Sequence, residues 1–87
     1  MSFYKKKDFL LKRVKDLYFI VNQKKGTIVN LNEVSFFIWN CLDKPLDVAG
    51  LVGLLTTEYD VNESEAKSDI EDFLEIALKS GIIDKVK

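Results

Sequence analysis

The sequence predicts an α+β fold, a three-stranded antiparallel sheet followed by three helices in a winged helix-turn-helix-like arrangement. Two observations support this prediction. Short runs of β-branched, aliphatic and aromatic residues, separated by turn residues, occupy positions 9–32, which is typical of a strand meander. Apolar residues then recur at helical spacing in three segments between Glu33 and Leu78, and each segment follows a capping residue.

The three strands are expected at residues 9–14, 17–22 and 27–32. Lys15-Asp16 forms the turn between the first two, and a hairpin loop follows in which Gly26 takes the left-handed conformation. The third strand has a neighbour on only one side of the meander. Its other edge is therefore expected to be open, unless the rest of the fold covers it.

The first helix is expected over residues 33–42, because Asn32 is a good N-cap and Glu33 interacts favourably with the positive end of the helix dipole. Its apolar stripe is wide, as in helices that are buried between a sheet and other helices. Core packing is therefore the favoured role for Trp39.

The second helix is expected after its cap Asp47, although two glycines inside it weaken it. The third helix has stronger signals, because Asn62 and Glu65 resemble a capping box at its start and Gly81 supplies a left-handed end. Its buried face is expected to consist of Ala66, Ile70, Phe73, Leu74, Ala77 and Leu78.

Length and composition indicate one small domain. Eighty-seven residues, 47% hydrophobic and 31% charged, suffice for a single core but not for two. The domain is expected to span residues 9–87, after a basic arm of residues 1–8 for which a solvated tail is the favoured interpretation. No apolar run is long enough for a membrane span and no signal-peptide pattern is present, so we expect a cytoplasmic protein without a membrane partner.

The chain has no histidine and one cysteine, Cys41. Histidine is the commonest general base and a frequent zinc ligand, and a single thiol forms no internal disulfide. Cys41 lies on the apolar stripe of the first helix, where a small buried hydrophobe is favoured over a nucleophile. The sequence therefore predicts a non-enzymatic protein with no catalytic residue, no metal site and no cofactor.

The net charge of −1 conceals a strong asymmetry. Residues 1–25 hold eight Lys or Arg and two Asp, whereas residues 26–87 hold five Lys and twelve acidic residues. Residues 62–80, which would be the recognition helix of a winged-helix protein, carry six acids and two lysines. Because phosphate contacts dominate DNA affinity, no nucleic-acid partner is expected.

A second line of residues runs beside the buried stripe of the third helix and contains Asp69, Phe73, Ile76 and Ser80. Ile76 is informative because it lies off the centre of the stripe and should be partly exposed, although an isolated surface isoleucine is an equal alternative. With the open edge of the third strand, this line would form a groove. Such a groove suits strand addition, in which main-chain bonds supply affinity and side-chain pockets supply selectivity.

Several motifs follow one another in a set order: Leu31-Asn32, Ile38-Trp39, the capped helix from Asp47, Asp69-Ile70, Phe73-Leu74, Leu78 and Gly81-Ile82. In order and spacing they resemble the PqqD-like family, the peptide recognition elements of ribosomally made, modified peptides (RiPPs). The resemblance covers about residues 9–83. Lys44-Pro45 stands where the family usually has an Asp-Gly turn. This departure bears on the geometry of that loop and leaves the expected groove unaffected.

The resemblance implies that the leader segment of a precursor peptide binds as an added strand between the third strand and the third helix. Carried over position by position, it implies peptide contacts from Thr27, Ile28, Val29, Asn30, Leu31, Asp69, Phe73, Ile76 and Ser80. The protein would present the leader to modifying enzymes in PQQ-like or lasso-type biosynthesis. The partner would be a radical SAM enzyme, or a protease and cyclase, and the protein itself a monomer or weak dimer.

Two alternatives stay open at the level of sequence. One is a winged-helix DNA-binding transcription regulator, which the acidic third helix disfavours. The other is a structural subunit that uses its open strand for self-association.

Overall fold

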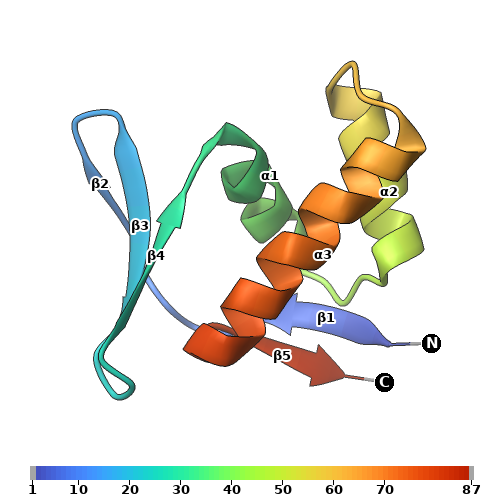
Figure 1. Ribbon diagram of the computed structural model, residues 1–87. Coiled ribbons are helices and arrows are strands. Elements are labelled where there is room, and N and C mark those ends of the chain that lie inside the picture. The colour runs from blue at the N-terminus through green and yellow to red at the C-terminus, as the bar shows by residue number, and fades with distance from the viewer. Residues whose placement is uncertain (1, 87) are drawn as a thin grey trace.

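Figure 1 shows the computed structural model, which describes residues 2–86. The elements are β1 (Phe3–Lys6), β2 (Leu11–Val14), β3 (Leu17–Asn22), β4 (Thr27–Leu31), α1 (Glu33–Cys41), α2 (Val48–Glu58), α3 (Glu63–Ser80) and β5 (Ile83–Val86). Strands β2, β3 and β4 form an antiparallel sheet in that order, and β1 and β5 form a separate antiparallel pair. The mixed composition of strands and three helices is confirmed, whereas the sequence signals miss β1 and β5.

The three helices begin where capping residues predict. Asn32 Oδ1 accepts a hydrogen bond from Ser35 N at 2.8 Å, and Ser35 Oγ accepts one from Asn32 N at 2.9 Å, which completes a capping box. Asp47 Oδ1 accepts from Gly50 N at 2.8 Å and Asn62 Oδ1 accepts from Glu65 N at 2.7 Å, so each side chain caps its helix, α2 or α3, through a single bond. The capping box expected from Asn62 and Glu65 is thus formed on one side only, without the return bond from Glu65. Gly81 ends α3 in the left-handed conformation, with φ of 75°.

Strand β1 lies in the segment for which a solvated basic arm is expected. Residues 3–6 pair with β5 along their whole length. Lys6 Nζ lies 2.7 Å from Asp43 Oδ1 and 5.2 Å from the centre of the Trp39 ring. Residues 3–6 are thus a paired strand on the body of the fold and not a solvated tail. The charge of Lys6 is accommodated there because its ammonium group reaches a carboxylate and an aromatic ring.

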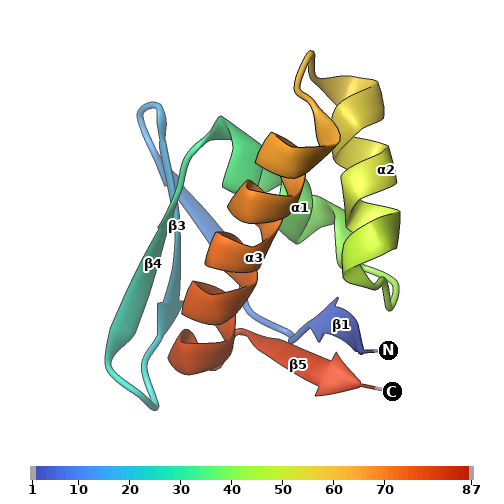
Figure 2. The same ribbon diagram turned by 45° about the vertical axis from the view of Figure 1, so that its right-hand side comes forward.

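Helices α1 and α3 cover one face of the β2–β3–β4 sheet, and α2 packs against them on the side away from the sheet, as the two views in Figures 1 and 2 show. The buried core between them contains Ile20, Val29, Leu31, Ile38, Trp39, Leu42, Leu51, Leu55, Ile70, Phe73 and Leu74. The expected core role of Trp39 is confirmed, since it is 2% exposed. No helix within residues 2–86 combines the length and the apolar character that crossing a membrane requires.

Candidate functional site

Strand β4 has one paired and one unpaired edge. It pairs with β3 from Tyr18 opposite Leu31 to Asn22 opposite Thr27, and it is the last strand in the order of its sheet. Within residues 2–86 no other strand pairs with its second edge. Alternate residues of an antiparallel strand direct their N–H and C=O groups to opposite edges, so β4 offers unpaired backbone groups to an added strand.

The hairpin end of β4 is attached to the C-terminal end of α3. Asn22 Nδ2 donates to the Ser80 carbonyl oxygen at 2.8 Å, and Thr27 Oγ1 donates to the same oxygen at 3.2 Å. Asn22 is 4% exposed, and these bonds satisfy a buried amide and a carbonyl that the end of the helix leaves free. The positive φ of Gly81 favours glycine, and a Cβ there would also lie 3.0 Å from Asn22 Nδ2, close enough to press on the amide that bonds to Ser80.

Beyond this attachment a cavity of about 290 Å³ opens between β4, the start of α1 and α3. Its lining consists of Val29, Asn30, Asn32, Val34, Ser35, Ile38, Asp69, Asp72, Phe73 and Ile76. Val29, Ile38 and Phe73 are buried and supply apolar surface, while Asp69, Asp72 and Ile76 are exposed on α3. The site therefore combines an open strand edge, an apolar interior and two carboxylates.

The structure brings together five of the nine residues expected to contact a peptide: Val29, Asn30, Asp69, Phe73 and Ile76. Thr27 and Ser80 instead form the bond that closes the hairpin end of the groove. Leu31 is buried in the core, and Ile28, at 63% exposed, lies on the sheet face opposite the helices. Any contact of Ile28 with an added strand would be through its backbone, and peptide contact itself stays a prediction for all nine.

Five lining residues are missing from the sequence prediction: Asn32, Val34, Ser35, Ile38 and Asp72. Signals for several of them exist. Val34 and Ser35 lie in the first turn of a helix that follows β4 directly, so they must lie close to the end of the strand. Asp72 follows Asp69 by three residues, a spacing that places both on one helix face.

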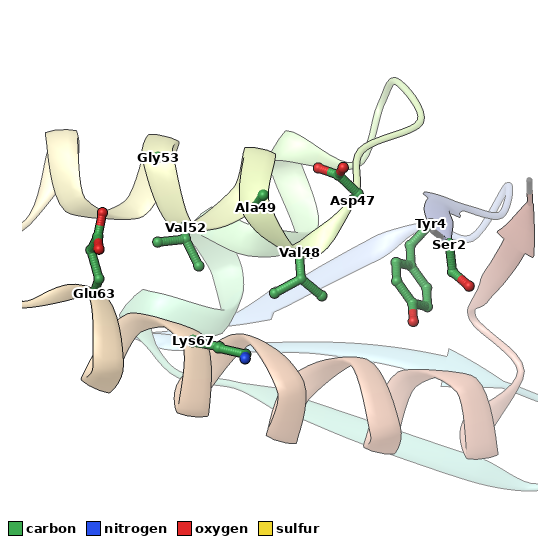
Figure 3. Close-up of a pocket in the computed structure, with 9 residues that line it drawn as sticks. All are labelled: Ser2, Tyr4, Asp47, Val48, Ala49, Val52, Gly53, Glu63 and Lys67. Atoms are coloured by element: carbon green, nitrogen blue, oxygen red, sulfur yellow. The ribbon is translucent and has the colours of Figure 1, made fainter.

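A larger cavity, of about 650 Å³, lies on another side of α3, between α2, α3 and the start of β1. In Figure 3, Val48, Val52 and Lys67 extend into the space between the two helices, and Tyr4 lies at its end. The N–H and C=O of Tyr4 are already bonded to Leu46, at 2.8 and 3.0 Å. Because this cavity combines helical walls with a strand residue that is already paired, it suits strand addition poorly despite its size.

Cys41 is partly buried against the core and is poorly suited to act as a nucleophile. Burial, and to a lesser extent the carboxylate of Glu58, raise the pKa of its thiol above the ordinary value. A raised pKa reduces the population of the reactive thiolate at neutral pH. Within residues 2–86 no group of three or more His, Cys, Asp or Glu side chains is arranged to hold a metal ion.

The fold and the groove define a small α+β protein in which an unpaired strand edge lies beside a partly apolar cavity, an arrangement that suits strand addition. Residues 18–83 match the family described as Coenzyme PQQ synthesis protein D (PqqD), and the chain belongs to this family. The expected PqqD-like resemblance is therefore confirmed.

The fold is also similar to a solved structure described as TbiB1 in complex with the TbiA(beta) leader peptide. The TM-score is 0.75 and the sequence identity 22%, over 92% of this chain and 94% of that one. At this identity the similarity confirms the fold. No curated protein matches the sequence.

Proposed function

We propose that this protein captures the leader segment of a ribosomally made precursor peptide as an added strand on β4 and presents it to modifying enzymes. The observation that carries the proposal is the unpaired edge of β4 beside the cavity that Phe73 and Ile76 line. Membership of the PqqD family and the similarity to TbiB1, whose solved structure contains a leader peptide, support it.

The groove provides two kinds of binding energy. An added strand of about five residues would form several main-chain hydrogen bonds with β4, each contributing ~0.5–1.5 kcal/mol. One or two apolar anchors in the cavity would add ~1.5–3 kcal/mol each. The ordering of a flexible leader opposes both contributions, so the expected Kd is micromolar or somewhat tighter. This corresponds to a binding free energy of about −8 kcal/mol.

In this proposal the protein is a binding module and the partner enzyme supplies the chemistry. The groove has a strand edge, apolar side chains and carboxylates, and Cys41 lies outside its lining with a raised thiol pKa. A radical SAM enzyme, or a protease and cyclase, would modify the presented peptide. The recognition domain would comprise the expected residues 9–87 together with β1, which precedes them in the chain and pairs with β5.

The leader of a short precursor encoded beside this protein's gene is the probe that tests the proposal. Titrated into ¹⁵N-labelled protein, the synthetic leader should shift amide resonances of residues 27–31 and 69–76. Nuclear Overhauser contacts between leader backbone protons and β4 should show the added strand. Shifts confined to Tyr4, Val48, Val52 and Lys67 would instead place the peptide in the larger cavity and refute strand addition.

A further inference from the structure

We propose that the groove selects leaders in which Lys or Arg stands beside the apolar anchor, and that Asp69 and Asp72 are the selecting residues. The inference rests on the proposed function and deepens it, because it specifies the chemistry of the bound peptide. Two carboxylates lie at the edge of the apolar cavity that a bound leader would cover.

Asp69, Asp72, Phe73 and Ile76 follow one another along α3 at intervals of three, one and three residues, which places them on one helix face. All four line the cavity beside β4. An added strand on the open edge of β4 would therefore have its backbone at the strand and some of its side chains against this face. A side chain beside the anchor would come close to both carboxylates.

Among the residues that the structure describes, Asp69 and Asp72 have no cationic partner. Within residues 2–86 the three ion pairs are made by other acids, namely Asp43, Glu75 and Asp84. None of the residues that line the cavity is Lys or Arg. Two negative charges thus lie beside apolar surface that a bound peptide would cover, and covering them partly removes their water.

This arrangement penalises neutral and acidic neighbours of the anchor more than basic ones. A neutral residue would desolvate the carboxylates without replacing their hydrogen bonds, and an acidic one would also be repelled. A Lys or Arg would pair with one or both of them. An exposed pair is weak, but two carboxylates partly desolvated by the peptide make a preference of about tenfold for Lys over Glu reasonable.

Asp69 and Asp72 precede Ser80 on α3 by eight residues or more, so both lie away from the hairpin end of the groove. There Lys25 Nζ donates to the Lys79 carbonyl oxygen at 3.4 Å, beside the attachment of Thr27 to Ser80. The preference for a basic residue should therefore be confined to the end of the leader that lies near Asp69. Charge complementarity of this kind also fixes the register and direction of a bound strand.

A random library of twelve-residue peptides displayed on phage provides a probe that assumes no particular leader. Selection on the immobilised parent protein should enrich peptides with Lys or Arg within two positions of an apolar residue. The double variant Asp69→Asn/Asp72→Asn should still select apolar peptides but lose the enrichment in Lys and Arg. The matched control Glu63→Gln/Glu71→Gln, with the same charge change on other faces of α3, should retain it.

Binding measurements with one selected peptide then give the size of the charge preference. Changing its Lys or Arg to Glu should weaken binding to the parent about tenfold, and binding to Asp69→Asn/Asp72→Asn less than twofold. An equal loss on both proteins, or no enrichment in Lys and Arg on the parent, would overturn the inference.

The variant Ile76→Glu separates this inference from the proposed function. If the selected peptides show no charge preference but Ile76→Glu abolishes their binding, the groove is correctly placed and only the inference about charge fails. If selected peptides bind regardless of Ile76, the groove itself is wrongly placed, and both proposals fail.

Discussion

Replacement of Ile76 by glutamate tests the proposed groove most directly. Ile76 is 53% exposed on α3 and lines the cavity next to the buried Phe73. Since about half of the side chain is already in water, its replacement should lower the stability of the free protein by only about 1 kcal/mol, which leaves it folded. A change in peptide binding can then be attributed to the groove.

The loss of affinity is estimated from two contributions. A bound leader would cover the exposed half of Ile76, and half of the ~1.5–3 kcal/mol for complete burial is about 1 kcal/mol. A glutamate there would also be desolvated without a partner and beside Asp72, at a cost of ~1–3 kcal/mol. Together these predict a loss of about 2–4 kcal/mol, or a Kd at least ~30-fold weaker.

The matched control is Leu54→Glu. Leu54 is 43% exposed on α2 and lies outside the lining of the groove. The change in charge is the same and the change in shape similar, on another helix, so leader binding should stay within about twofold of the parent.

Fluorescence anisotropy with a labelled leader measures both variants, and circular dichroism melting curves confirm that each is folded. The reasoning is refuted if folded Ile76→Glu binds the leader within about threefold of the parent. Side chains on α3 would then form no wall of the site.

Further predictions concern stability, reactivity and the competing function. Asn22→Ala removes a buried hydrogen bond to Ser80 and should lower the unfolding free energy by ~1–2 kcal/mol. In a thermal melt each kcal/mol lowers Tm by ~4–8 °C, whereas the control Asn30→Ala, at an exposed position, should leave Tm nearly unchanged. Because burial raises its thiol pKa, Cys41 should react with iodoacetamide at pH 7 more slowly than a free cysteine, and an equal or faster rate would contradict this. At physiological salt a gel-shift assay should show no sequence-specific duplex binding, and a nanomolar operator complex that is lost on mutation of α3 would show that the peptide-binding interpretation is wrong. Incubated alone with its precursor, the protein should leave the peptide unchanged in mass, and any stoichiometric cleavage that Cys41→Ala abolishes would disprove the non-enzymatic interpretation.

Helix starts and the β3–β4 hairpin were predictable because their determinants are local. Asn32 and Asn62 each bond to a backbone N–H three residues later, so residues close in sequence are enough to indicate a cap. Gly26 and Gly81 have positive φ, which the residue type itself favours. Strands β1 and β5 were not predictable in this way, because each is four residues long and its partner lies at the other end of the chain.

The sequence by itself determined which segments form the sheet and helices and that Phe73 and Ile76 share a helix face, because periodicity and capping act over a few residues. Only the tertiary structure decided which face of β4 meets the helices, so that Val29 lines the cavity while Ile28 lies on the opposite face. It also decided that the second edge of β4 stays unpaired within residues 2–86 and that Asp72 joins Asp69 beside it. These features depend on how α3 lies along β4, and that placement is set by core packing and by the contact of Asn22 with Ser80, 58 residues apart in the chain.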